Sequence, residues 1–340
     1  EALAVETRLG LASIAAHGHS HPDTVAIFEA ASKRPGLDRD AAASFVVWYG
    51  LWCGHHVRGE AHLAQGSAAA LHAASLAHGA PANVMMGVRS LGITALMNGD
   101  AREALARHAE AEAMENIPRD RAQAQIVGQD QSVSFRSYYG LTLWLSGQGT
   151  RAWATIQDSI RLAREGGHPG SLGYGLTHAI LGALGLGQRE MAQTWCAELF
   201  DKASEFRLGM WRDYALRFQG LIDLAIGGGT EPLLAARQAL AGRSVGLFAA
   251  YADLMAADLL LDRGALDDAA KWLARGEAAL QPGHECWAAP EALRIAGRLA
   301  ALQGDQAGAA DLTARALARA TECGLLAFAL KAAVQGADLA

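Results

Sequence analysis

Apolar residues recur three and four positions apart along most of this chain, which is the period of one face of an α-helix. Residues 84–97 and 132–145 show the pattern clearly, and in both stretches it fades at a glycine. Residues 101–113 and 266–280 are amphipathic instead, with Arg and Glu gathered on one face. Alternation with a period of two is nowhere sustained, so we expect no β-sheet. The pattern predicts an all-α fold.

Turn-like glycines recur about every 40 residues, and an alanine follows most of them by five positions. Glycine adopts a positive φ without a Cβ penalty, so one helix can end there and the next can begin at once. Small residues on both helices let them pack closely as an antiparallel pair. The repeat therefore predicts about eight helical hairpins. The turn glycines are Gly18, Gly59, Gly99, Gly147, Gly187, Gly228, Gly264 and Gly304; the alanines are Ala64, Ala104, Ala152, Ala192, Ala269 and Ala309; and a further glycine precedes three of the turns at Gly92, Gly140 and Gly297.

This arrangement of small residues resembles the tetratricopeptide repeat, although the period is closer to 40 than to 34. We expect residues 1–340 to form a single tetratricopeptide-like, right-handed α-solenoid. One interval between turn glycines is longer than the others, and its extra segment, residues 114–130, contains Pro118. We expect a longer connection there, with room for an additional helical turn. Residues 325–339 form a helix without a partner, which we expect to cap the C-terminal end.

Several short motifs carry a closer resemblance: DQSVSFRSY at 130–138, LWLSG at 143–147, ARE at 163–165, HPGSL at 168–172, EALRIAG at 291–297 and LKAA at 330–333. Together they resemble the tetratricopeptide-type C-terminal tail of bacterial STAND-ATPase signalling proteins. Such tails follow an ATPase module in ATPase-fused adenylate or guanylate cyclases and in winged-helix or LuxR-type transcriptional regulators, including maltose-activator-like ones. Lys331 replaces a usual Arg, and Gln131 replaces a usual Pro at the entry to its helix. The resemblance implies a regulatory or scaffolding domain that binds a protein or a small molecule, with the output module outside this fragment.

Composition and charge exclude several classes of partner. The chain has 51% apolar and 19% charged residues and a formal net charge of −6, without a basic run, so we expect no direct contact with nucleic acid. Its apolar stretches are about half the length that a membrane span needs, and residues 1–10 lack the pattern of a secretory signal. We therefore expect a cytoplasmic protein with neither a cofactor nor a metal site. The cysteines are far apart in sequence, as is typical of a reducing compartment: Cys53, Cys196, Cys286 and Cys323.

Three local motifs invite a catalytic or ligand-binding interpretation. Residues 242–246 match the G-x-S-x-G nucleophile elbow, but that chemistry needs a preceding strand, so an inter-helix turn is favoured. Residues 166–170 are glycine-rich but lack the G-K-[ST] ending of a phosphate loop, which favours a connection between repeats. His56 and Glu60 have metal-ligand spacing, but a predicted turn at Gly59 separates them. We therefore expect solvated or helix-capping histidines.

The inner face of the solenoid is the predicted binding surface. In a tetratricopeptide solenoid the first helix of each hairpin lines the concave groove, and the position ten residues before each turn glycine should face it. These positions combine aromatic, hydroxyl and guanidinium groups, as a groove for a peptide or a small polar ligand requires. We expect Arg89 to bind an anionic or carbonyl-rich ligand. The candidate site residues are Tyr49, Arg89, Ser137, Thr177 and Phe218, with Trp144 beside them.

Two functions remain open at this point. The first is a non-catalytic interaction or sensor domain that binds a protein segment or a small effector, with oligomerisation possible. The second is an all-α enzyme of the α/α-toroid hydrolase type, which would need convergent carboxylates on its inner helices. The acidic residues lie mostly in second helices and turns, for example Glu110, Glu112, Asp267 and Asp268. This distribution favours the interaction domain.

Overall fold

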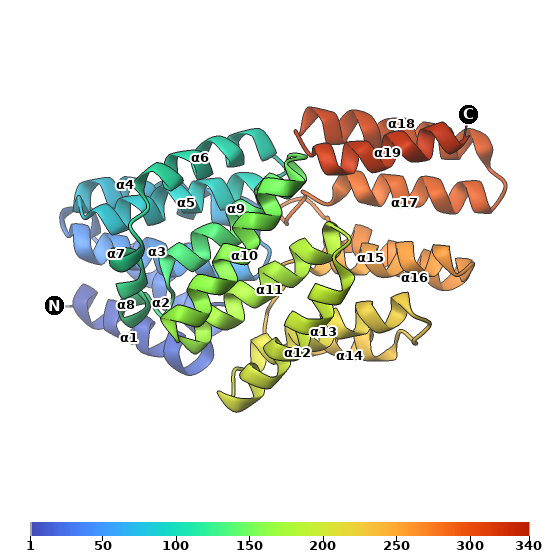
Figure 1. The fold of residues 1–340 in the computed structure, drawn as a ribbon. Helices are drawn as coiled ribbons and strands as arrows, with labels where there is room; N and C mark the ends of the chain where they lie inside the picture. Colours follow the sequence, from blue (N-terminus) through green and yellow to red (C-terminus); the bar gives the residue numbers. More distant parts are fainter. Residues whose placement is uncertain (1, 340) are drawn as a thin grey trace.

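The computed structural model describes residues 2–339, and within them every regular element is helical. Helices pair in sequence order into hairpins that stack side by side, which confirms the predicted α-solenoid (Figure 1). The eight hairpins are α1 (Ala2–His17) with α2 (Pro22–Ser32), α3 (Ala41–Val57) with α4 (Ala61–His78), α5 (Pro81–Met97) with α6 (Ala101–Met114), α9 (Gln131–Leu145) with α10 (Gly149–Gly166), α11 (Pro169–Gly185) with α12 (Arg189–Glu205), α13 (Gly209–Ala225) with α14 (Glu231–Gly242), α15 (Ala249–Asp262) with α16 (Leu266–Ala279), and α17 (Ala289–Leu302) with α18 (Gln306–Glu322).

Three further features complete the described chain. A 3₁₀ turn, Leu37–Arg39, precedes α3, and α19 (Leu326–Leu339) packs against α18 at the C-terminal end, as expected of a cap. The long connection holds two short helices, α7 (Ile117–Ala122) and α8 (Ala124–Val127), where we expected at most one more turn. None of the helices within residues 2–339 combines the length and the apolar content that a bilayer crossing requires.

The hairpin turns use the expected glycines with one exception. Gly99 has φ 81° and Gly304 has φ 91°, which is the left-handed conformation that only glycine adopts without strain. In the turn after α13, however, Gly227 rather than Gly228 takes the positive φ, at 104°. A three-glycine turn offers the chain this choice, so spacing alone could not identify the residue.

Close packing within each hairpin follows the small residues, with the contact shifted by one helical turn. Ala152 is fully buried, as expected, but Gly140 in the partner helix faces Ile156, one turn beyond that alanine. A Cβ on Gly140 would lie 2.6 Å from Cγ1 of Ile156. The other two pairs repeat this offset. Ala104 and Ala309 are fully buried, while Gly92 faces His108 and Gly297 faces Thr313.

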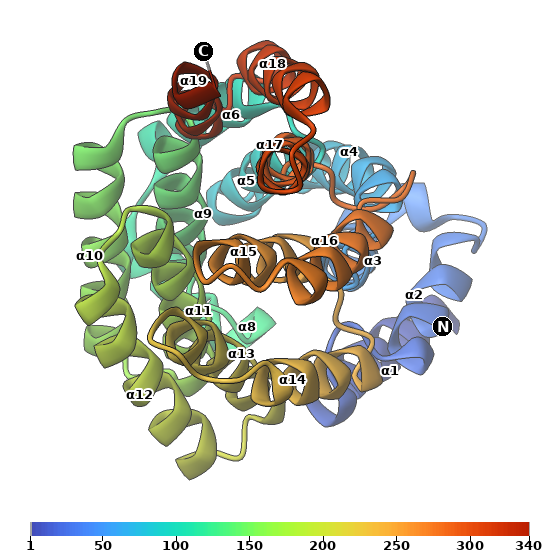
Figure 2. The same cartoon turned by 90° about the vertical axis from the view of Figure 1, so that its right-hand side faces the viewer.

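The solenoid winds far enough that its last hairpins contact its first ones. We call this contact the seam; it joins the inter-helix turns after α3 and α5 to the loops before α15 and α17 and the turn after α18 (Figure 1). Figure 2 shows the same winding, with α10, α12 and α14 around the outside of the view and α15 and α17 nearer its middle. Backbone N–H groups donate across the seam from Gly246 and Leu247 to the carbonyl of Val57 (3.0 and 3.1 Å), from Glu285 to Gly59 (2.9 Å), from Cys286 to Met97 (2.8 Å), from Ala101 to Cys323 (3.0 Å) and from His62 to Gly283 (3.1 Å).

The G-x-S-x-G segment belongs to this seam. It spans the end of α14 and the loop before α15, as the inter-helix interpretation predicted. A Cβ on Gly246 would lie 2.1 Å from the carbonyl oxygen of Arg58, so only glycine fits there. The glycine therefore allows the loop to approach the backbone closely across the seam. The next two residues, Leu247 and Phe248, are buried in the interior of the solenoid.

Candidate functional site

A cavity of about 90 Å³ lies at the inner side of the solenoid, beside the seam. We call it the central cavity. Helices α3, α5, α11 and α13 supply most of its wall, and the loop before α15, which belongs to the seam, closes it. Residues that define it are Tyr49, Trp52, Arg89, Thr177, His178 and Phe248.

Arg89 is the most unusual of these residues. Its side chain is 2% exposed, yet its Nε and Nη2 atoms have no hydrogen-bond partner within residues 2–339. The guanidinium lies over the Trp52 ring, 5.4 Å from the ring centroid, which is a cation–π contact. Among the described residues that line the cavity, none is Asp or Glu. A buried cation without a carboxylate carries a desolvation cost that the protein itself does not offset.

Other polar groups around the cavity are also without partners. Besides those of Arg89, the buried side-chain atoms of lining residues that make no hydrogen bond within the described chain are His19 Nε2, Gln129 Nε2, Ser134 Oγ, Thr177 Oγ1 and His178 Nε2. Most buried polar groups in folded proteins are hydrogen-bonded, so such a concentration around one hollow calls for an explanation. Gln129 ends the long connection that follows α6, which places that segment at the cavity as well.

The histidines of the cavity are neutral. Burial lowers the pKa of His19 to about 4, that of His56 to about 3 and that of His178 to about 4, because a charged imidazole would lose its hydration there. His178 Nδ1 lies 2.8 Å from the carbonyl oxygen of Tyr174, so Nδ1 carries the proton. The free Nε2 is then an acceptor directed at the cavity. The wall thus offers a cationic donor, Arg89, together with a neutral acceptor.

The structure brings together half of the predicted site residues. Tyr49, Arg89 and Thr177 line the central cavity. Ser137 lies between α9 and α10, where its hydroxyl is 2.9 Å from that of Ser159. The remaining two do not line the cavity: Trp144 contacts Tyr251 and Phe328, and Phe218 stacks on Tyr214. The predicted line of groove residues remains a prediction, and its members occupy different environments.

Sequence reasoning missed several members of the cavity. Trp52 lies one turn after Tyr49 on α3, and Tyr174 lies one turn before Thr177 on α11. Residues three positions apart share a helix face, so these neighbours could have been included. Phe248 and Gln129 could not, because they come from loops whose position depends on how far the solenoid winds.

The predicted surface histidines also behave differently from one another. His21 and His168 cap α2 and α11, as expected of capping histidines. His56, by contrast, is buried, with Nε2 2.7 Å from the Tyr138 hydroxyl, so the expectation of solvation was wrong there. Within residues 2–339 no group of three or more potential metal ligands is present.

Two other hollows differ from the central cavity in how their charges are arranged. One, of about 280 Å³, lies on the inner side between α11, α13, α15 and α17, and its lining includes Leu184 and Leu254. Three of the charged residues that line it belong, with two neighbouring arginines, to what we call the charge ladder, in which every member is ion-paired with another: Asp258, Glu291 and Lys331 from the lining, with Arg294 and Arg298.

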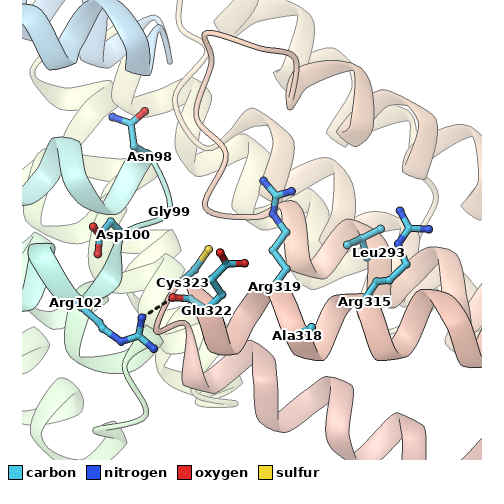
Figure 3. A pocket seen from close by; sticks show the side chains of 10 residues that line it. All are labelled: Asn98, Gly99, Asp100, Arg102, Leu293, Arg315, Ala318, Arg319, Glu322 and Cys323. Atoms are coloured by element: carbon cyan, nitrogen blue, oxygen red, sulfur yellow. Dashed lines mark hydrogen bonds between the residues drawn. The ribbon is translucent and has the colours of Figure 1, made fainter.

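The other hollow is on the outside of the seam, beside the turn Asn98–Asp100 (Figure 3). There Arg102 donates to the backbone carbonyls of Glu322 (2.5 Å) and Thr321 (2.8 Å) and so caps the end of α18. Its role is structural, since it satisfies carbonyls that the end of a helix leaves open.

Comparison with known proteins supports the fold. No family model matches the chain, and no curated protein sequence matches it significantly. The chain is similar in structure to a Rap protein complexed with competence and sporulation factor, with a TM-score of 0.59 and 11% identity, over 99% of this chain and 97% of that one. A comparison with the tetratricopeptide domain of P58(IPK) covers 98% of both chains at 12% identity, with a TM-score of only 0.27. The chain therefore has the helical-repeat architecture of the Rap protein.

Proposed function

We propose that this chain is a non-catalytic interaction and sensor domain that holds a small effector, or the end of a protein segment, in its central cavity. The observation that carries the proposal is Arg89, a buried guanidinium whose Nε and Nη2 have no partner within the described chain. A group that costs free energy in the empty protein is favourable when a ligand completes it. Tyr49, Thr177 and Trp52 would contact the same ligand, while Ser137, Trp144 and Phe218 would shape the helices around it.

The surrounding architecture supports this function. The Rap protein that shares the fold was crystallised with competence and sporulation factor, and the motif resemblance to STAND-ATPase tails suggests a cytoplasmic signalling or transcription-regulatory parent. The cavity is built from early hairpins and from a loop of a late one, so a ligand there would contact α3 and α5 and also the loop before α15. Ligand binding would then stabilise one arrangement of the early hairpins against the seam and would signal through it to an attached output module.

The alternative of an all-α hydrolase receives less support. Acid–base catalysis of that kind needs two carboxylates facing one substrate. Among the described residues lining the central cavity there is no carboxylate, and those of the charge ladder are engaged by arginine and lysine.

The proposal is tested by a thermal-shift screen of the chain against a metabolite library, followed by a cavity-filling variant. A ligand at a hundred times its dissociation constant stabilises the folded state by about 2.7 kcal/mol, which moves the melting temperature measurably. Thr177→Met should abolish the shift, because the longer side chain occupies the cavity. Ala318→Met, which fills the hollow outside the seam, is the matched control and should bind normally. Hits that bind equally well to both variants would contradict the assignment of the cavity.

A further inference from the structure

The central cavity is small and selective, and its wall describes the ligand that completes it. Its volume of about 90 Å³ is well below the roughly 150 Å³ of a protein cavity that takes up benzene, and corresponds to about three water molecules. The enclosed part of a ligand is a short group of a few heavy atoms.

The charges and donors of the wall determine the chemistry of that group. Arg89 presents two free N–H positions, Nε and Nη2, and a carboxylate accepts both in a bidentate pair. His178 presents a lone pair at Nε2, because its Nδ1 donates to the Tyr174 carbonyl. A buried acceptor that has no partner in the cavity wall is satisfied by a donor from the ligand. Thr177 Oγ1 can donate or accept, whereas Gln129 Nε2 can only donate and would therefore contact the carboxylate.

We infer that the central cavity binds a carboxylate whose neighbouring atom carries a hydrogen-bond donor. The carboxylate pairs with Arg89, and the adjacent O–H or N–H donates to His178. Two sources present this chemistry: a short 2-hydroxy acid, and the C-terminal residue of a peptide, whose amide N–H is adjacent to its carboxylate. The inference rests on the proposed function and specifies its ligand class.

The route into the cavity accommodates either source. Trp211, Met210 and Gln129 line it and are only partly buried, so this side opens toward solvent. A free hydroxy acid would fill the cavity alone, whereas a peptide would extend outward past these residues. Trp52 and Trp211 both belong to the wall, which makes tryptophan fluorescence a direct reporter of binding.

The experiment compares small probes that differ in charge and in hydrogen-bond donors, by calorimetry, by thermal shift and by tryptophan fluorescence. Glycolate and lactate represent the free acids, and N-acetylglycine represents a peptide C-terminus. Glycolamide removes the charge, and acetate removes the donor. We expect the acids that carry a donor to bind, acetate to bind about tenfold more weakly, and glycolamide to give no response. Preference for N-acetylglycine over glycolate identifies the peptide source, and the reverse preference identifies the free acid.

Substitutions at Arg89 separate ligand recognition from stability. Arg89→Met should weaken acid binding by about ten- to hundredfold, since a charged hydrogen-bonded pair is lost, while the melting temperature of the ligand-free protein stays the same or rises. Arg89→Lys keeps the positive charge but cannot form the bidentate hydrogen bonds, so it should retain part of the affinity for the acid. His178→Phe keeps the stacking on Tyr174 but removes the acceptor, so the affinity for glycolate should fall to that for acetate.

Several outcomes would overturn the inference. Equal binding of glycolamide and glycolate would show that charge is not recognised, and unchanged acid binding in Arg89→Met would show that another residue provides it. Failure of every carboxylate probe to bind the wild-type chain would also reject the ligand class. If the metabolite screen meanwhile finds a neutral or cationic ligand that Thr177→Met excludes, the sensor function stands and the carboxylate class alone is wrong.

Discussion

Two arginines occupy the same repeat position in this solenoid and have opposite surroundings. Arg89 and Arg294 each lie ten residues before a turn glycine, on the first helix of their hairpins, and both are buried. Arg294 donates to Glu291 (2.8 and 3.0 Å) and to Asp258 (2.5 Å). Arg89 has no carboxylate partner within the described residues and faces a hollow. The repeat places both side chains at the same position of the hairpin, and the neighbouring helices determine whether a carboxylate partner is present there.

The largest expected difference between the two regions is their response to acid. Burial lowers the pKa of His19, His56 and His178 to between about 3 and about 4. The folded protein therefore binds fewer protons than the unfolded chain once the pH falls below about 6.5, and the free energy of unfolding decreases by about 1.4 kcal/mol per pH unit for each histidine. We expect the melting temperature to fall steeply between pH 6.5 and pH 4.

The charge ladder should respond only at lower pH. Burial raises the pKa of Asp258, but Arg294 and Arg298 outweigh it and hold that pKa below its usual value. Its stabilisation is thus complete above the usual carboxyl pKa and is lost only below it. Glu285, whose pKa burial raises to about 7, opposes the histidines between pH 4.5 and 7. Melting curves that stay constant from pH 7 to pH 5 would contradict neutral histidines in the cavity.

Substitution of the two arginines gives the next largest effect. Arg294→Met leaves the buried Glu291 without its arginine partner and should cost about 3 kcal/mol of unfolding free energy, which urea denaturation can measure. Arg89→Met breaks no ion pair and should cost nothing. If both variants lose stability equally, Arg89 supports the fold in the same way as Arg294, and its role in ligand binding becomes doubtful.

A third substitution affects the cavity and leaves the ladder intact. Gly246→Ala places a Cβ against the Arg58 carbonyl and should cost about 1–3 kcal/mol through overpacking. Because Leu247 and Phe248 follow directly, the fluorescence of Trp52 should change as well. Gly242→Ala is the matched control within the same motif. It has open space around its Cβ position and lies at the end of α14, so its melting temperature should hardly change.

The smallest expected effect is at Lys331, where the signalling-protein tails that the sequence motifs resemble usually have Arg. Lys331 Nζ lies 3.1 Å from Glu291 and is 41% exposed, so its ion pair is only partly shielded from water. Lys331→Arg restores the usual residue and could pair with both oxygens of Glu291, with an expected gain of about 0.5 kcal/mol. A differential scanning comparison with wild type measures it. A loss in place of a gain would show that the ladder has no space for a second guanidinium beside Arg294.

The sequence predicted the local parts of this structure. Helix periodicity and turn glycines depend on neighbouring residues, so the hairpins followed from the sequence directly. The contrast between the two arginines is also visible in the sequence. Glu291 precedes Arg294 by one helical turn and can pair with it, whereas Met86 occupies that position before Arg89. The seam, and with it the loop residues Phe248 and Gln129, could not be predicted. Which loop contacts which inter-helix turn depends on the sum of the small rotations between successive hairpins, and the sequence pattern does not give these rotations.

The seam also affects how the chain folds and unfolds. In an open repeat array each unit contacts only its neighbours, so unfolding can begin at one end and proceed unit by unit. Here the turns at Gly59 and Gly99 are hydrogen-bonded to residues near positions 285 and 323, at the far end of the sequence. The first hairpins cannot complete their packing until the last ones are in place. Folding therefore requires contacts of high sequence separation, and the repeats melt as one cooperative unit instead of a series.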